Sequence, residues 1–272
     1  MTDLDISEIV NLAQKIRAHC LTMVHKANAS HIGSALSITD ILAVLYGSVL
    51  KLDPSNPKCA DRDRFILSKG HACVAVYAAL AETGFFDASL LTTYGANHSD
   101  FMSHISHRVP GVEFSTGSLG HGLPFGVGKA LAAKKQAKRW RTVVLLSDGE
   151  WDEGSNWEAC MFARHQKLDN LIGIVDYNKL QSLNSVANTL ALEPFADKFR
   201  AFGWSVQEVD GHDHAAMQKV LIRAPWEPAK PSILIAHTIK GKGVSYMENK
   251  VEWHYKSPNE AQLAQALAEL TL

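Results

Sequence analysis

The first clear pattern along the chain is a set of apolar residues at helical spacing. This spacing predicts an amphipathic helix over residues 6–25. A second helix is predicted to begin at Ser37 and to run through Leu50, because Ser37 and Asp40 have the three-residue spacing of a capping box. The stretch 257–270 predicts a closing helix at the other end of the chain.

Short apolar runs bounded by glycine and polar residues predict a buried sheet. One strand ends at Leu67 and leads through a glycine turn into a helix that continues to Ala81, and residues 116–136 predict a glycine-rich turn and a further helix. Four more strands are predicted at Thr142–Ser147, Leu171–Tyr177, Ser205–Val209 and Ile233–His237, separated by helices at 154–168, 193–202 and 214–224. This alternation predicts an α/β fold with a mostly parallel sheet and helices on both faces. No linker or repeat interrupts it, so residues 1–272 are expected to form one domain.

Polar segments follow four of these predicted strands. They read "SKGHA" after Leu67, "SDGEWDEGSNWEA" after Leu146, "DYNKLQS" after Val175 and "HTIKGKG" after Ala236. In open parallel sheets, ligands bind outside the carboxyl ends of the strands. We therefore expect these segments to meet at one site.

Composition excludes several other classes of protein. The chain has 272 residues, 46% of them apolar, and a net charge of −1, so no basic excess indicates nucleic-acid binding. The start of the sequence lacks the pattern of a signal peptide, and no apolar stretch reaches the length of a membrane span. Its four cysteines are far apart in sequence and form no CxxC pair. They are typical of reduced thiols in a cytoplasmic protein, without zinc or disulfide bonds.

The acidic segment after Leu146 has simpler explanations to weigh first. Asp148, Glu150 and Asp152 alternate as in a calcium-binding loop, but Glu153 occupies the position that needs glycine, and Ala159 the one that needs glutamate. The order of glycines in "GSLGHG" also differs from that of a dinucleotide-binding turn. Acidic residues at a helix start would account for part of the segment. They would not explain why Asp148-Gly149 follows one predicted strand while Asn178 follows the next.

That pair suits a magnesium ion bound to phosphates. Asp148 offers a carboxylate, Asn178 an amide oxygen and Leu180 a backbone carbonyl, and Mg²⁺ prefers oxygen ligands of these kinds. Gly149 would let the backbone approach a diphosphate at the start of the following helix. The metal would then join the acidic residues to the phosphates.

Asp-Gly followed about 28 residues later by Asn resembles the thiamine diphosphate motif, and the rest of the chain resembles transketolase. The matching stretches occur in family order between about residues 10 and 255. They are "ASHIGSALSITDILAVLY", "DRDRFILSKGHACVAVYAAL", "PGVEFSTGSLGHGL", "SDGEWDEGSNWEA", "DYNKLQS" and "TIKGKGVSYMENKVEWH". Six blocks in order are far more specific than the metal motif alone.

The resemblance implies a role for each matching residue. Asp148, Asn178 and the Leu180 carbonyl would hold Mg²⁺ or Ca²⁺. The residues implied to contact thiamine diphosphate are His71, Gly117, Leu119, Gly149, Glu150, Asn178, Ile239 and His254. The implied catalytic residues, which would handle substrate oxygens, are His31, His71, His104 and His254. Glu153 and Glu158 match buried glutamates at the subunit interface of the family.

Some positions depart from the family pattern. Ser147 stands where glycine is usual, and His121 replaces a glutamine. In "MSHISHRVPGVE" the family's donor-site histidine falls on Ser103, so His104 beside it is the expected substitute. The donor and acceptor sugars stay open for this reason, and the sequence does not identify the pathway or the partner chain.

A full transketolase continues through a pyrimidine-binding domain and a C-terminal domain, which residues 1–272 lack. The resemblance therefore predicts the N-terminal subunit of a split transketolase, which pairs with a separate C-terminal subunit to form an α₂β₂ assembly. The enzyme would transfer a two-carbon ketol unit from a phosphorylated or modified ketose to an aldose. Two alternatives stay open: a subunit of another thiamine diphosphate enzyme, such as a 2-oxoacid dehydrogenase, and a non-catalytic cofactor-binding subunit.

Overall fold

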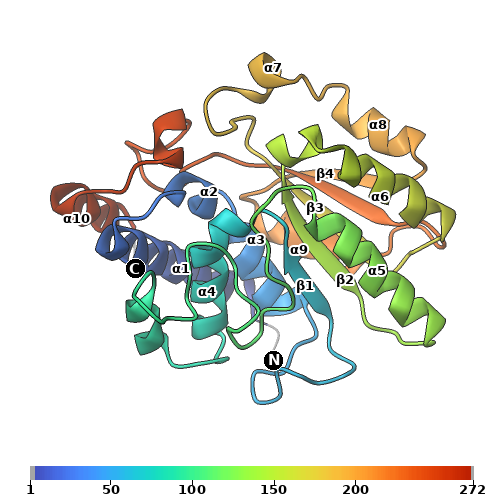
Figure 1. Ribbon diagram of the computed structural model, residues 1–272, viewed down its shortest axis with the longest axis horizontal. Coiled ribbons are helices and arrows are strands. Elements are labelled where there is room, and N and C mark those ends of the chain that lie inside the picture. The colour runs from blue at the N-terminus through green and yellow to red at the C-terminus, as the bar shows by residue number, and fades with distance from the viewer. Residues whose placement is uncertain (1–3, 271–272) are drawn as a thin grey trace.

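A computed structural model describes residues 4–270, with a five-stranded sheet at the centre (Figure 1). The strands are β1 (Arg64–Leu67), β2 (Thr142–Ser147), β3 (Leu171–Tyr177), β4 (Ser205–Asp210) and β5 (Ser232–His237). Their order is β1-β2-β3-β5-β4, and all neighbouring pairs are parallel. The predicted α/β fold with a parallel sheet is confirmed. Of the expected domain 1–272, residues 1–3 and 271–272 lie outside the described part.

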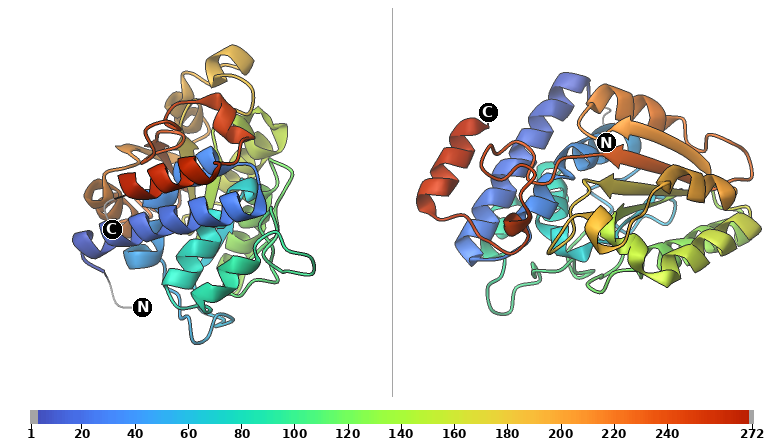
Figure 2. Two further views of the ribbon diagram at one scale, coloured as in Figure 1. Left: turned by 90° about the vertical axis from the view of Figure 1, so that its left-hand side faces the viewer. Right: turned by 90° about the horizontal axis from the view of Figure 1, so that it is seen from above.

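Alternate side chains of the strands enter two separate apolar cores. On one face, Val143, Leu145 and Ile174 pack in the same core as helices α1 (Ile6–Ala27), α3 (Thr39–Val44), α4 (Cys73–Glu82) and α9 (His214–Ile222). On the other face, Val144 and Leu146 pack in a core with α5 (Gly122–Lys135), α6 (Gly154–His165) and α8 (Phe195–Ala201). Figure 2 shows these layers from two further sides. Burial on both faces explains why the central strands read as continuous apolar runs.

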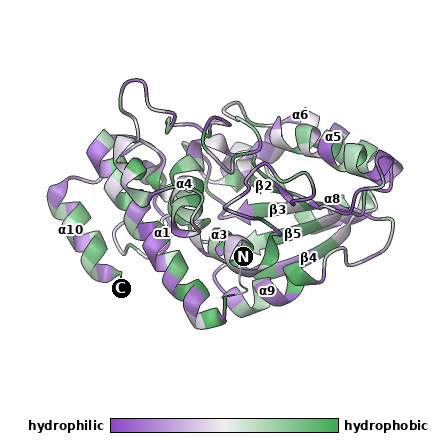
Figure 3. Cartoon of the chain, turned by 90° about the horizontal axis from the view of Figure 1, so that it is seen from below, coloured by the Kyte–Doolittle hydropathy of each residue, from purple (hydrophilic) through white to green (hydrophobic). Residues whose placement is uncertain are grey.

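The outer helices carry the polar surface. Asp5 and Glu8 form a capping box at the start of α1, and Asn259 and Gln262 form another at the start of α10 (Glu260–Glu269). Figure 3 shows hydrophilic and hydrophobic residues mixed along both helices, whereas α4 is hydrophobic over most of its surface. This pattern agrees with α4 packing against α1, α2 and α3, where every residue from Cys73 to Ala81 is buried.

The prediction of one capped helix from Ser37 to Leu50 was wrong. The chain forms two short helices, α2 (Ile32–Leu36) and α3, and then a π-helical turn, η1 (Leu45–Val49). Ser37 ends α2, and its hydroxyl donates to Asp176 Oδ2 at 2.7 Å instead of capping a helix. The Asp40 carboxylate accepts a hydrogen bond from Arg17. Both polar side chains are bound by distant buried partners, which a local capping pattern does not reveal.

Two further expectations are settled by the fold. β4 is not a buried strand: it lies at the edge of the sheet, and Gln207 and Glu208 are exposed. The four cysteines are free thiols in the structure. Within residues 4–270, no helix has the length and apolar character needed to cross a membrane.

The remaining short elements are η2 (Gly70–Ala72), η3 (Ala88–Thr93), η4 (Gly149–Asp152), α7 (Val186–Thr189) and η5 (Val251–His254).

Candidate functional site

The carboxyl ends of β1, β2, β3 and β5 meet at a cavity of about 130 Å³. The predicted residues that line it are His71, Leu119, Asp148, Gly149, Asn178, Leu180 and His254. Ser147, which replaces the usual glycine, also lies in its wall. A larger hollow of about 700 Å³ includes Arg141, just before β2, and so lies toward the opposite ends of the strands. Ligands of parallel sheets bind at the carboxyl ends, so the smaller cavity is the candidate site.

The Asp148 carboxylate lies at the acidic end of this cavity. Its Oδ1 accepts from Gly149 N–H at 2.7 Å, and its Oδ2 accepts from Lys179 N–H at 2.6 Å. Burial raises the pKa of the Asp148 carboxyl to about 7, and the charge of Asp176 adds to this effect. Among residues 4–270, Asp148 has no cationic side chain within ion-pair distance. A cation in the cavity would stabilise its ionised form.

Asn178 and Leu180 supply further oxygens beside this carboxylate. Asn178 Nδ2 donates to Asp176 at 3.1 Å, which fixes the amide, and its Oδ1 accepts from Leu180 N–H at 3.1 Å. The Leu180 carbonyl accepts from the ammonium of Lys240 at 3.2 Å. A carboxylate, an amide oxygen and a carbonyl match the ligands that Mg²⁺ prefers. The residues present therefore fit a divalent cation.

Asp176 lies beneath the cavity and connects its walls. The fully buried carboxylate accepts from Lys69 Nζ at 2.6 Å and from Ser37 Oγ at 2.7 Å, and Thr238 Oγ1 donates to its other oxygen. Burial acts to raise the pKa of Asp176, but the charge of Lys69 and these hydrogen bonds hold it below its usual range. Asp176 is therefore an anion that fixes groups from four segments of the chain, including Asn178.

Lys69 and Lys240 give the cavity a positive side, which sequence analysis missed. Lys240 Nζ donates to the Gln181 carbonyl at 2.8 Å and lies 3.0 Å from His254 Nδ1. Burial, followed by the charge of Lys69, lowers the pKa of Lys240 to about 8. A Cβ on Gly149 would lie 2.9 Å from the Gln181 side chain, so only glycine fits there without displacement. Two buried ammonium groups beside an open backbone fit a diphosphate.

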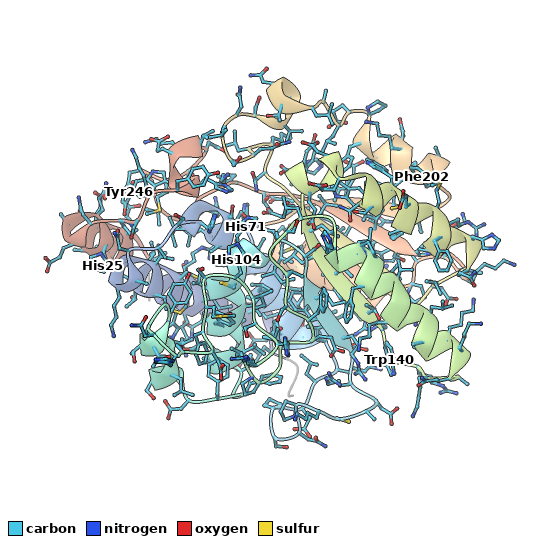
Figure 4. All side chains as sticks on the ribbon, viewed as in Figure 1. His25, His71, His104, Trp140, Phe202 and Tyr246 are labelled. Atoms are coloured by element: carbon cyan, nitrogen blue, oxygen red, sulfur yellow. The ribbon has the colours of Figure 1, made fainter. Side chains whose placement is uncertain are left out.

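Four histidines gather beside this cavity. The ring centroid of His31 lies 5.0 Å from that of His71, 5.9 Å from that of His104 and 5.1 Å from that of His254. Figure 4 labels His71 and His104, which lie close together near α2 and α4. His107 lies outside this cluster, and its ring is hydrogen-bonded to Ser115. The structure thus brings His104, and not His107, to the cluster.

Burial keeps three of these imidazoles, those of His31, His71 and His254, neutral. It lowers the pKa of His31 to about 4 and that of His254 to about 3, and it lowers the pKa of His71 well below its usual value. His31 has a left-handed backbone, with φ of 77°, and its N–H donates to the His254 carbonyl at 2.7 Å. Such a conformation is uncommon outside glycine, and here it places the His31 ring against those of the other three histidines. Neutral rings offer both a proton donor and a proton acceptor.

Three predicted cofactor residues do not line the cavity. The buried Glu150 carboxylate accepts from Ser68, from Gly120 N–H at 2.9 Å and from Ser147 N–H at 3.3 Å, so it fixes the surrounding turns instead. Gly117 is exposed beside His104. Ile239 is half-buried.

The predicted interface glutamates lie on the surface of this chain. Glu153 and Glu158 are exposed at the start and in the middle of α6. His121, the replacement for glutamine, is also exposed, and its Nδ1 lies 2.9 Å from the Leu119 carbonyl. None of the three lies in the wall of the cavity.

Comparison with known proteins gives a consistent result. The sequence model of the family described as transketolase, thiamine diphosphate binding domain, matches residues 9–271. The chain is 40% identical to an apulose-4-phosphate transketolase subunit from Phocaeicola vulgatus, over 95% of this chain and 92% of that one. It is 41% identical to the 6-deoxy-6-sulfo-D-fructose transketolase subunit SqwG of a Clostridium species, over 97% of this chain and 96% of that one.

A solved structure shares the fold. Transketolase from Campylobacter jejuni superposes with a TM-score of 0.92 at 33% identity. The match covers 98% of this chain and 43% of that one. This chain therefore spans about two fifths of the length of that transketolase, but almost the whole length of the two relatives above.

The raised pKa of Asp148 predicts a specific pH dependence of stability without metal. Between the ordinary value of 3.8 and the folded value of about 7, the folded chain keeps a proton that the unfolded chain has lost. The contribution of Asp148 is therefore full at acidic pH and is lost as the pH rises to 7. The free energy of unfolding of the wild type, relative to Asp148→Asn, should fall by at most about 1.4 kcal/mol per pH unit.

Urea titrations from about pH 4.5 to about pH 8 measure this difference, which should become flat above pH 7. Asp100→Asn is the control, because Asp100 is exposed and its replacement should leave the pH profile unchanged. Parallel profiles for the wild type and Asp148→Asn would contradict the raised pKa.

Proposed function

This chain belongs to the transketolase family, as a thiamine diphosphate binding domain, and we propose that it is one subunit of a transketolase completed by a second polypeptide. The proposal is carried by four histidines beside a cavity with an acidic and a positive side. The two relatives named as subunits support a separate partner, since the chain matches each over more than nine tenths of its length. We expect an α₂β₂ assembly in which Glu153 and Glu158 lie at an interface.

The two sides of the cavity suit the two parts of a metal diphosphate. Asp148, Asn178 and the Leu180 carbonyl hold Mg²⁺, or Ca²⁺ in its place, because they are oxygen donors with an uncompensated carboxylate. Lys240, which bonds to carbonyls and to no carboxylate, balances part of the negative charge of the phosphates, and Lys69 adds positive charge beside it although it pairs with Asp176. Gly149 and His71 supply close contacts from the wall of the cavity, together with His254. When bound, thiamine diphosphate supplies the carbon nucleophile and the electron sink that cleavage of a ketose requires.

The residues of this chain position the organic rings and handle protons. Gly117, Leu119 and Ile239 contact the ring system of the cofactor. His31, as the ring nearest to the other three, moves a proton to and from a sugar hydroxyl. Hydrogen bonds from neighbouring rings stabilise an oxygen that develops negative charge. His104 is the exposed member of the cluster and contacts the donor sugar.

The proposed reaction transfers a two-carbon ketol unit from a ketose to an aldose. Both relatives are named for unusual ketoses, one bearing a phosphate and the other a sulfo group. Together with the displaced histidine segment around His104, this supports a phosphorylated or otherwise modified ketose as donor. A 2-oxoacid donor would instead indicate a different thiamine diphosphate enzyme.

Replacement of Asp148 tests the metal. Asp148→Ala should abolish Mg²⁺-dependent binding of thiamine diphosphate, because the remaining ligands are neutral. Calorimetry with and without Mg²⁺ measures this, and Asp100→Ala is the exposed control. Affinity equal to that of the wild type would exclude Asp148 as a metal ligand.

Replacement of His31 separates proton handling from cofactor binding. His31→Asn tolerates the positive φ but cannot shuttle a proton, so kcat should fall by roughly 10² to 10⁴ while the affinity for thiamine diphosphate is kept. Steady-state kinetics of the complete enzyme and calorimetry give the two values. His107→Asn, in the same loop as His104 but bonded to Ser115, should keep full turnover. Unchanged turnover in His31→Asn would remove His31 from the mechanism.

Isolation of the complex tests the proposed function as a whole. Native mass spectrometry of the chain captured with thiamine diphosphate and Mg²⁺ should reveal a second polypeptide in equal copy number. Ketose-to-aldose transfer should require both chains. Cofactor binding without transfer in the complete complex would favour a non-catalytic subunit, and turnover of 2-oxoacids would favour a dehydrogenase subunit.

A further inference from the structure

A buried polar cluster lies behind the segment that carries Ile239 and Lys240, away from the wall of the cavity. Its centre is Asp40, which is 2% exposed and lies in α3. Arg17 of α1 donates to Asp40 Oδ2, and His212 Nδ1 lies 2.7 Å from the same oxygen. His214 Nε2 lies 2.9 Å from Oδ1. No residue of this cluster lines the cavity, and none has a role in the proposed reaction.

The contacts of His212 fix its tautomer. Its Nε2 accepts a hydrogen bond from the backbone N–H of Ile239 at 2.9 Å, so Nε2 carries no proton. The proton is then on Nδ1, where it is donated to Asp40. A neutral His212 thus connects the buried carboxylate to the backbone at Ile239. His212 comes immediately after β4 and Gly211. Because β4 and β5 are parallel neighbours, His212 lies close to the segment that follows β5.

Arg17 holds the same segment at a second point. Its Nε donates to the Lys242 carbonyl at 3.2 Å, while its Nη2 is bonded to Asp40. Gly243 lies against the Arg17 side chain, where a Cβ would come within 3.0 Å of it. The N–H of Ile239 and the carbonyl of Lys242 are therefore both tied to Asp40, each through one side chain. Lys240 lies between them and extends to the cavity.

We propose that His212 is a positioning residue, which holds the backbone of residues 238–243 so that Ile239 and Lys240 face thiamine diphosphate. The step from backbone position to cofactor affinity rests on the proposed function. The geometry itself does not, because the hydrogen bonds of Asp40 and His212 join residues of this chain alone. His212 acts only through the Ile239 N–H and touches no reacting group.

Two variants of His212 separate this role from simple stabilisation. His212→Asn keeps a donor for Asp40 at the place of Nδ1 but leaves the Ile239 N–H without an acceptor. His212→Gln provides an oxygen at the place of Nε2 and gives up the bond to Asp40. Each variant loses one hydrogen bond, so a purely structural role would affect both alike. His19→Ala is the control, since His19 pairs with Glu82 and makes no backbone contact that reaches the cavity.

Hydrogen exchange and calorimetry are the two readouts. Deuterium uptake at residues 238–243 of the ligand-free chain should rise in His212→Asn and stay near wild type in His212→Gln. Affinity for thiamine diphosphate with Mg²⁺ should fall roughly 10- to 100-fold in His212→Asn, the usual effect of losing an outer-shell partner. It should stay close to wild type in His212→Gln. Equal behaviour of the two variants, or the reverse order, would overturn the proposal.

If either His212 variant does not fold, a measurement on the wild-type protein tests the proposal instead. Nitrogen-15 NMR of the histidine rings should show His212 protonated at Nδ1 only, and a proton on Nε2 would overturn the assignment. If the wild type in complex with its partner chain fails to bind thiamine diphosphate, the proposed function is wrong. The exchange difference between the Asn and Gln variants still decides whether His212 holds residues 238–243.

Discussion

The buried ion pair between Asp176 and Lys69 is the contact on which the rest of the site depends. Asp176 lies on the central strand β3, and Lys69 follows β1, so the pair joins two strands that do not touch each other. The same carboxylate holds Ser37, Thr238 and Asn178. Removing one partner of such a pair leaves a buried charge uncompensated, at a typical cost of about 3–5 kcal/mol. Loss of the pair would therefore displace several walls of the cavity together.

This pairing also determines which charges are left for ligands. Lys69 pairs with Asp176, whereas Asp148 on one side and Lys240 on the other have no ion-pair partner among residues 4–270. Burial acts on both in the direction that disfavours charge, raising the pKa of Asp148 and lowering that of Lys240. A cation near Asp148 would lower the pKa of that carboxyl, and an anion near Lys240 would raise the pKa of that ammonium group. On the proposed function, a metal diphosphate would bring these two charges in one molecule and so match the two electrically opposite sides of the cavity.

Much of the fold could be predicted from the sequence, because β2 and β3 are continuous apolar runs and a parallel sheet places their polar ends together. Asp148 and Asn178 were found in this way. Sequence reasoning failed where a residue's partner is distant. Ser37 resembled a helix cap although its hydroxyl binds Asp176, 139 positions away. Lys69 was overlooked because lysine is usually solvated, and no pattern in the sequence connects His212 to Ile239.

On the proposed function, the same charges would couple cofactor binding to proton transfer. Burial and the neighbouring His104 lower the pKa of His31, and the positive charges of Lys240 and Lys69 lower it further. A diphosphate bound between the two lysines offsets their charge, so on the proposed function the pKa of His31 rises when the cofactor binds. A neutral His31 then becomes better able to take up a proton only in the loaded site. One set of buried charges would thus select the cofactor and prepare the histidine that acts beside it.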